Sequence, residues 1–157
     1  MYQLPVTFES ADVNATSFGY DRVSLIDHPG DTMTTSHQII LLAHGSSDRR
    51  WCETFERLAA PTLHSVEHSA IAYMELAEPS LETIVSQGKE TGTLNFTIVP
   101  LFLAAGRHLR KDVPAMIEEL ENQHGVSIKL ADPIGQNPQL GDAIRDVVMQ
   151  ELAGTIA

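Results

Sequence analysis

Four short apolar runs alternate with amphipathic stretches along this chain, and this alternation constrains the fold more than any other feature of the sequence. The runs cover residues 39–43, 69–76, 97–103 and 126–130 and show little polar alternation. Such runs are typical of strands buried on both faces of a parallel sheet. Helices are expected over residues 49–65, 78–88 and 113–123 and from residue 138 onward, and Pro61 should kink or interrupt the first of them.

The order β-α-β-α-β-α-β-α predicts an α/β fold with a four-stranded parallel sheet covered by helices on both faces. In the usual strand order 2-1-3-4 the switch point lies between the first and third strands, and ligands bind at the carboxyl ends of the strands there. Residues 37–157 are expected to form this single domain. Residues 1–36 lack a sustained apolar period, so we expect a flexible N-terminal extension.

Composition excludes several classes of function. The 157 residues carry a formal net charge of −11, which argues against nucleic acid or an anionic membrane as the main partner. No apolar run is long enough to span a membrane. The single cysteine, Cys52, allows no intrachain disulfide and is expected to serve packing, so the predicted location is the cytoplasm.

Two histidines follow the strands that flank the switch point. His44 ends the first strand in a His-Gly turn, and His108 follows the third strand after Ala105-Gly106. Two imidazoles across one crevice can hold a divalent metal or move protons, and Glu75 at the end of the second strand would add a carboxylate. The alternatives are that each His turn only begins a helix, that Glu75 is merely solvated, and that Glu78 takes its role.

The turn after His108 also carries a helix-start signal. Asp112 followed by Pro114 is typical of a capping side chain and a first-turn proline. Five of the ten Lys and Arg residues lie within six positions of His44 or His108, which predicts a cationic rim suited to a carboxylate-bearing ligand. The sequence lacks the phosphate-loop, dinucleotide, nucleophile-elbow and H-E-x-x-H motifs.

Four segments together resemble one known family. They are Leu-Leu-Ala-His-Gly-Ser-Ser-Asp at 41–48, Tyr-Met-Glu-Leu-Ala-Glu-Pro-Ser-Leu at 73–81, Val-Pro-Leu-Phe-Leu-Ala-Ala-Gly-Arg-His-Leu-Arg-Lys-Asp-Val-Pro at 99–114, and Asp-Pro-Ile-Gly-Gln-Asn-Pro-Gln-Leu at 132–140. The set is similar to the class II tetrapyrrole chelatases of the small CbiX type, which comprise sirohydrochlorin cobaltochelatases and ferrochelatases. The resemblance covers residues 39–152.

The resemblance implies a flavodoxin-like chelatase unit, often paired as a homodimer, that inserts a divalent metal into the tetrapyrrole sirohydrochlorin without ATP, in cobalamin or sirohaem biosynthesis. It implies that His44, His108 and Glu75 act in catalysis and metal binding. The candidates for substrate binding are Arg49, Arg50, Arg107, Arg110, Ser46 and Gly106. Co²⁺ is the expected metal substrate, with Fe²⁺ or Ni²⁺ as alternatives, and no permanently bound cofactor is expected. A tetrapyrrole or metal carrier without turnover, and an unrelated small α/β enzyme, remain alternative functions.

Overall fold

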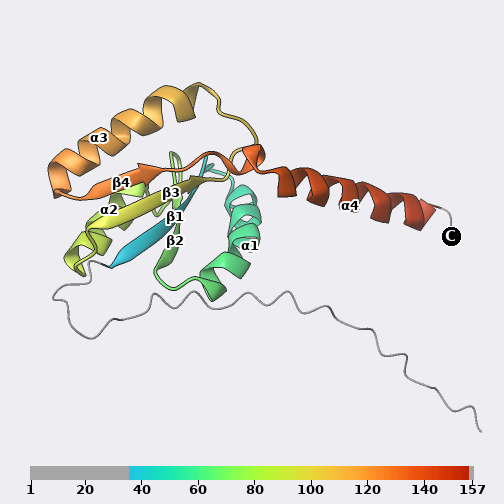
Figure 1. The fold of residues 1–157 in the computed structure, drawn as a ribbon, viewed down its shortest axis with the longest axis horizontal. Coiled ribbons are helices and arrows are strands. Elements are labelled where there is room, and N and C mark those ends of the chain that lie inside the picture. The colour runs from blue at the N-terminus through green and yellow to red at the C-terminus, as the bar shows by residue number, and fades with distance from the viewer. Residues whose placement is uncertain (1–35, 156–157) are drawn as a thin grey trace, which may run out of the picture.

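The computed structural model describes residues 36–155, and the predicted extension over residues 1–36 falls almost entirely outside this part of the chain. The strands are β1 (His37–Ala43), β2 (Ser69–Tyr73), β3 (Asn95–Pro100) and β4 (Ser127–Leu130). All neighbouring pairs are parallel, and the order is β2-β1-β3-β4 (Figure 1). The α/β class and the strand order predicted from the sequence are therefore confirmed.

Four α-helices and two short helical turns connect and follow these strands. They are α1 (Arg49–Ser65), α2 (Leu81–Glu90), η1 (His108–Asp112, a π-helical turn), α3 (Val113–His124), η2 (Ile134–Gln136, a 3-10 turn) and α4 (Pro138–Thr155). Among the described residues, none of these helices has both the length and the apolar composition needed to cross a bilayer.

Pro61 does not interrupt α1, so of the predicted kink or interruption the interruption is wrong, while the predicted span of residues 49–65 is confirmed. The helix continues four residues beyond the proline to Ser65, and the Val66 amide then donates to the Thr62 carbonyl at 2.8 Å. A proline removes only its own amide donor, and the turns on either side still close. The cost is tolerated because α1 packs on the sheet through Cys52 and Ala59, which are buried.

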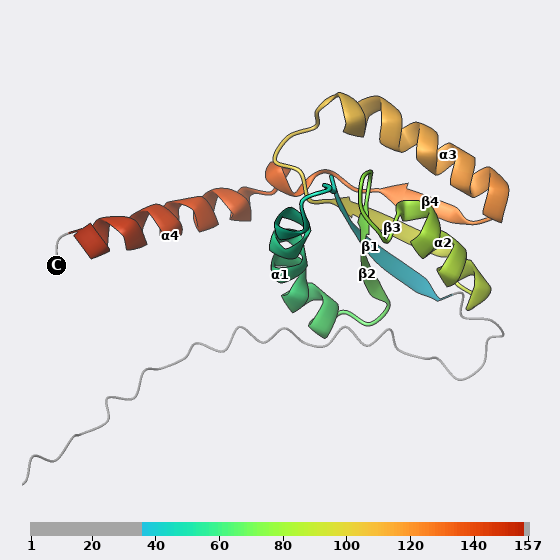
Figure 2. The same ribbon diagram turned by 180° about the vertical axis from the view of Figure 1, so that it is seen from behind.

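The main core lies on one face of the sheet, under α2 and α3. It joins alternate strand residues to the inner sides of the two helices: Ile40, Leu42, Ala72, Phe96, Ile98, Ile128, Leu81, Ile84, Val85, Val113, Ile117 and Leu120. The opposite face carries a smaller cluster in which Ala43 and Tyr73 pack against Cys52 and Phe55 of α1. Helices thus lie on both faces, but α4 projects away from the sheet in both views (Figures 1 and 2).

Two strands end earlier than the sequence predicts. We expected the second strand to reach residue 76, but β2 stops at Tyr73, and Leu76 adopts a left-handed φ of 59° in the loop that follows. We expected the third strand to reach residue 103, but β3 stops at Pro100. One further sheet-like bond follows, from the Leu101 amide to the Leu42 carbonyl at 2.8 Å, before the chain leaves to form the loop that carries the functional residues.

Candidate functional site

Three loops meet at the carboxyl ends of β1, β2 and β3. The turn after β1 lies against the loop after β2, since the Glu75 amide donates to the His44 carbonyl at 3.2 Å. Gly45 fits between them at a φ of 80°, and an ideal Cβ there would lie 2.0 Å from the Glu75 carbonyl oxygen. A larger residue at this position would force the two loops apart. The turn is therefore built for the close approach of these two backbones.

His44 and His108 lie side by side, although 64 positions separate them in the sequence. Their ring centroids are 6.1 Å apart and the ring planes are nearly perpendicular, at 85°. His44 stacks on Phe102 with a centroid distance of 4.2 Å and an angle of 25°. Phe102 is itself buried, so it provides a fixed surface that sets the plane of the His44 ring. The strand order predicts this juxtaposition, and the structure has it.

A widened helical turn positions His108. In η1 the Val113 amide reaches back to the His108 carbonyl, a span of five residues, instead of the four that an α-helix uses. The His108 Nδ1 atom lies 2.7 Å from an Asp112 carboxylate oxygen. This contact fixes the ring and leaves Nε2 available for a ligand. Asp112 was expected to cap α3, but its backbone is helical and its side chain caps no amide, because it bonds His108 instead.

Glu75 and Glu78 have different environments. The Glu78 carboxylate accepts from the Ser80 amide at 2.7 Å and from the Thr83 hydroxyl at 3.3 Å, so it stabilises the start of α2. Glu75 is exposed on the loop that borders a hollow of about 450 Å³. Within residues 36–155 no three His, Cys, Asp or Glu side chains form a metal-binding cluster, so Glu75 is not joined to the histidine pair as a third ligand.

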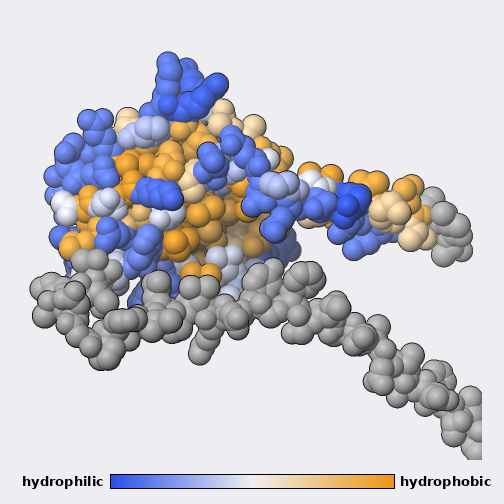
Figure 3. Space-filling view, in the orientation of Figure 1, coloured by the Kyte–Doolittle hydropathy of each residue, from blue (hydrophilic) through white to orange (hydrophobic). Residues whose placement is uncertain are grey.

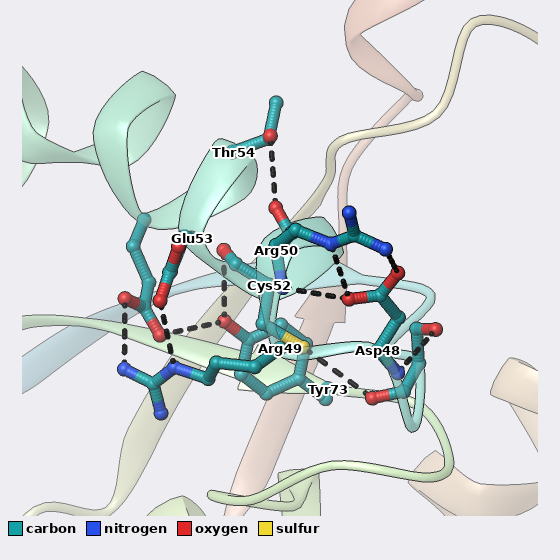
Figure 4. A network of polar contacts seen from close by, with 9 residues as sticks. Asp48, Arg49, Arg50, Cys52, Glu53, Thr54 and Tyr73 are labelled. Atoms are coloured by element: carbon teal, nitrogen blue, oxygen red, sulfur yellow. Dashed lines mark hydrogen bonds and ion pairs between the residues drawn. The ribbon is translucent and has the colours of Figure 1, made fainter.

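Two of the four candidate arginines are engaged with carboxylates at the start of α1 (Figure 4). Arg50 donates to both oxygens of Asp48, at 3.2 and 2.9 Å, and this guanidinium lowers the pKa of the Asp48 carboxyl. Arg49 lies 3.5 Å from oxygens of Glu53 and of Glu56. Both arginines are exposed and only Glu56 among their partners is half-buried, so the pairs are weak and can exchange with an anionic ligand.

The other candidates for substrate binding lie around the turn itself. Arg107 and Arg110 are exposed and form no ion pair with any other side chain in the described part of the chain. Gly106 has open space where a Cβ would stand. Ser46 has a structural contact, since its hydroxyl accepts from the Asp48 amide at 3.0 Å. The arginines near His108 in the sequence are thus unpaired in the described part of the chain, whereas Arg49 and Arg50, which follow His44, are paired with carboxylates.

A buried tyrosine at the end of β2 contacts α1, the helix that follows the turn after β1. The Tyr73 hydroxyl donates to Glu56 Oε1 at 3.3 Å and to the Cys52 carbonyl at 3.4 Å (Figure 4). Burial, reinforced by the negative charge of Glu56, raises the pKa of Tyr73 to about 12. Cys52 is buried as expected, and its thiol donates to the Ser46 carbonyl at 3.6 Å. These contacts tie α1 to the loop that carries His44.

Comparison with known proteins identifies the family. The sequence model of the CbiX family matches residues 38–151, which is most of the chain. The chain belongs to the CbiX family. A crystal structure described as a cobalamin (vitamin B12) biosynthesis CbiX protein from Marinobacter aquaeolei VT8 is 70% identical, with a TM-score of 0.75. That likeness covers 78% of this chain and 99% of the other.

Two curated relatives and a second structure extend the comparison. A sirohydrochlorin cobaltochelatase of Sulfurisphaera tokodaii is 26% identical over 73% of this chain and 92% of its own length. A chloroplastic sirohydrochlorin ferrochelatase of Arabidopsis thaliana is 28% identical over 73% of this chain and 52% of its own length. SirB from Bacillus subtilis with Fe³⁺ is 25% identical with a TM-score of 0.61, over 70% of this chain and 45% of that chain.

Two contributors to the site of this CbiX chain were not identified from the sequence. The i, i+4 spacing of His108 and Asp112 is a signal that could have indicated their pairing on one helical face. The stacking of Phe102 on His44 had no such signal, because Phe102 belongs to an apolar run that was expected to be buried strand. A contact between two separate loops depends on tertiary structure alone.

Proposed function

We propose that this CbiX chain is a metal chelatase that inserts Co²⁺ into sirohydrochlorin without ATP. Membership of the family supports this function, and so do the names of two relatives, sirohydrochlorin cobaltochelatases that are matched over 92% of their own length. The observation that carries the proposal is the pairing of His44 with His108 at the end of the sheet. The proposed pathway is cobalamin or sirohaem biosynthesis.

The separation of the two rings suits a shared metal ion. A first-row metal lies about 2.0–2.1 Å from an imidazole nitrogen, and hence about 3.2 Å from the ring centre. Two rings can therefore share one ion when their centres are up to about 6.4 Å apart. The observed 6.1 Å falls within this limit. Two protein ligands leave most coordination positions open, so the metal can pass to the four nitrogens of the macrocycle.

Metal insertion also requires proton acceptors. The metal dication replaces two pyrrolic N–H protons, and both protons must leave for the charge to balance. Neutral imidazole can accept a proton near neutral pH, and so can an exposed carboxylate. We propose that His44 and His108 present the metal, that Glu75 on the adjacent loop accepts one proton, and that an imidazole released by the departing metal accepts the other. Asp112 would act through His108 by holding its ring.

The substrate side of the site is proposed to be cationic and open. Arg107 and Arg110 would meet carboxylates of the macrocycle directly, and Arg49 and Arg50 would do so by exchanging their present partners. Gly106 would let the macrocycle approach the backbone, and Ser46 would shape the turn below it. We further propose that the active form is a homodimer located in the cytoplasm, with metal as a substrate and no resident cofactor.

The decisive test mixes the purified protein with sirohydrochlorin and Co²⁺ under anaerobic conditions and follows the absorption change of the macrocycle. We expect His44→Ala and His108→Ala each to reduce the rate by at least about 100-fold, since each removes a ligand and a proton acceptor. The matched control is His64→Ala, an exposed histidine near the end of α1 whose Nδ1 contacts its own helix at the Ala60 carbonyl. This control should react like the unaltered protein.

The same assay separates the alternatives. A rate no faster than that of the protein-free mixture would contradict the chelatase proposal and favour a carrier. Fe²⁺ and Ni²⁺ are compared in parallel, because one relative is named a ferrochelatase and SirB was solved with Fe³⁺. Faster insertion of Fe²⁺ than of Co²⁺ would keep the chelatase proposal and change its metal.

A further inference from the structure

Two strongly exposed leucines stand beside the histidine pair. Leu76 directly follows Glu75, whose amide bonds the His44 carbonyl, and its side chain is 72% exposed. Leu103 directly follows Phe102, which stacks on His44, and its side chain is 76% exposed. In the view of Figure 3 apolar surface gathers over the strands and along α4, which are faces of regular elements, whereas these leucines stand on loops. A single exposed leucine is ordinary on a protein surface, so exposure alone assigns them no role.

The backbone of Leu76 distinguishes it from other exposed leucines. Its φ of 59° lies in the left-handed region, which is strained for a bulky side chain. Within residues 36–155 the other non-glycine residue with a positive φ is His68, and histidine enters this region more readily than leucine. Such strain persists only where the surrounding structure imposes it, and it is concentrated at functional sites. The chain therefore holds Leu76 in this conformation at an energetic cost.

Hydrogen bonds on both sides of Leu76 fix the loop that carries it. On one side the Glu75 amide donates to the His44 carbonyl at 3.2 Å, and this bond holds the loop against the histidine turn. The loop also closes on itself, since the Tyr73 amide donates to the Pro79 carbonyl at 2.9 Å. Leu76 lies between these bonds and borders the hollow of about 450 Å³. The strained backbone thus keeps an apolar side chain in the open at the edge of the site.

A tetrapyrrole has two kinds of surface, and the groups assigned so far serve only one of them. Its carboxylates suit the arginines, but its conjugated ring is flat and apolar. Ligand pockets are lined mainly by apolar side chains, with a few polar groups that orient the ligand. Phe102 is not available for this purpose, because it is buried and already stacks on His44. The ring must approach the histidines to receive the metal, and an exposed leucine beside them would gain by being covered.

We infer that Leu76 contacts the apolar face of the macrocycle and that its strained backbone holds the side chain in place for this contact. The inference rests on the proposed substrate and adds a specificity-determining residue for it. β1 lies between β2 and β3 in the sheet, so Leu103 flanks the His44 turn from the other side and can contact the same ring. Of the two leucines only Leu76 has a left-handed backbone, and the tests are therefore made there.

The first test titrates each protein with metal-free sirohydrochlorin and follows the absorption of the macrocycle. In Leu76→Asn the backbone keeps its left-handed conformation, which asparagine adopts more readily than leucine, but the side chain is polar. We expect the dissociation constant to rise by about 10-fold, because the apolar contact is lost. Leu76→Met keeps that contact and should bind like the unaltered protein. The matched control is Leu58→Asn, which alters a leucine of α1 that is 70% exposed and should leave binding unchanged.

The second test separates a contact with the ligand from a structural role. Leu76→Asn should unfold at a temperature no lower than that of the unaltered protein, because backbone strain is relieved. Its affinity for Co²⁺ alone should not change, because the histidine pair is intact. In the insertion assay the KM for sirohydrochlorin should rise by about 10-fold at constant kcat, as expected when binding alone is weakened.

The outcomes decide between these roles. The inference is overturned if Leu76→Asn binds the macrocycle as tightly as the unaltered protein, if Leu76→Met binds as weakly as Leu76→Asn, or if Leu76→Asn unfolds at a lower temperature. A fall in kcat at constant KM also overturns it, since Leu76 would then only place Glu75. The titration needs no metal, so an unaltered protein that binds sirohydrochlorin without inserting Co²⁺ would contradict the proposed function and leave this inference intact. An unaltered protein that does not bind the macrocycle would overturn both.

Discussion

Replacing Asp112 with asparagine tests whether the carboxylate beside His108 prepares this histidine for metal. The Nδ1 to carboxylate distance of 2.7 Å is at the short end for a charge-assisted hydrogen bond. The carboxylate fixes the ring plane and makes the opposite nitrogen, Nε2, a better electron donor. Asparagine has nearly the same shape and can still accept from Nδ1–H, but it carries no charge.

The magnitude follows from the exposure of the pair. Removing the hydrogen-bond partner of a metal-binding histidine typically costs 10- to 100-fold in metal affinity. The side chains of His108 and Asp112 are 52% and 46% exposed, so water screens their interaction. We therefore expect the lower end, a loss of about 10-fold in Co²⁺ affinity, which is about 1.4 kcal/mol.

The assay is a titration of the protein with Co²⁺ alone, monitored by the visible absorption of the bound ion. His108→Ala sets the level expected when the ligand itself is lost. Glu118→Gln is the matched control, since it removes one exposed carboxylate from α3 without touching the histidine pair. The reasoning is refuted if the Asp112→Asn protein binds Co²⁺ as tightly as the unaltered protein while His108→Ala loses binding. Asp112 would then have a structural role only.

Two further predictions concern stability. Gly135→Ala should lower the free energy of unfolding by roughly 1–3 kcal/mol, because the new Cβ would overlap the Leu103 carbonyl. Gly141→Ala is the control and should not lower it, since the space around Gly141 is open. Thermal unfolding of the two variants measures the difference. Burial raises the pKa of Tyr73 from 10.0 to about 12, so this hydroxyl contributes stability that is complete below pH 10 and lost as the pH rises through 12. Urea unfolding between pH 9 and 12 should show a loss of about 2–3 kcal/mol in the unaltered protein that Tyr73→Phe lacks, and parallel curves for the two proteins would contradict this cause.

The sequence predicted the element order and strand order because both depend on local pattern and on general rules of chain connection. Apolar runs mark buried strands, and parallel strands require helical crossovers. The same rules place His44 and His108 at one switch point, which is where the structure has them. These parts of the fold and the site needed no knowledge of tertiary contacts.

The ends of the elements and the details of the site could not be read in this way. β2 was expected to carry Glu75, but it stops at Tyr73, and Leu76 in the loop that follows is left-handed, a conformation for which an apolar leucine gives no signal. Asp112 fits the pattern of a helix cap equally well as that of a histidine partner, and only the three-dimensional contact decides.

The position of α4 shows a different limit of sequence patterns. The sequence predicts an apolar face on this helix and a sheet covered by helices on both faces, yet α4 projects away from the sheet. The spacing of apolar residues along a helix does not indicate which surface that helix packs against. The short connection at Asn137 and the contacts of Gly135 decide the direction of the helix, and they become visible only in the structure.

The extra residue in the π-helical turn at His108 has a consequence for how this chain tolerates length changes. Successive residues of a helix are rotated by about 100° around its axis. Deleting one residue between His108 and Asp112 would restore ordinary winding, but it would swing the imidazole by roughly that angle away from His44. A substitution in this turn changes one side chain and keeps the winding of the helix. A single-codon deletion would separate His108 from His44 while leaving every strand in place.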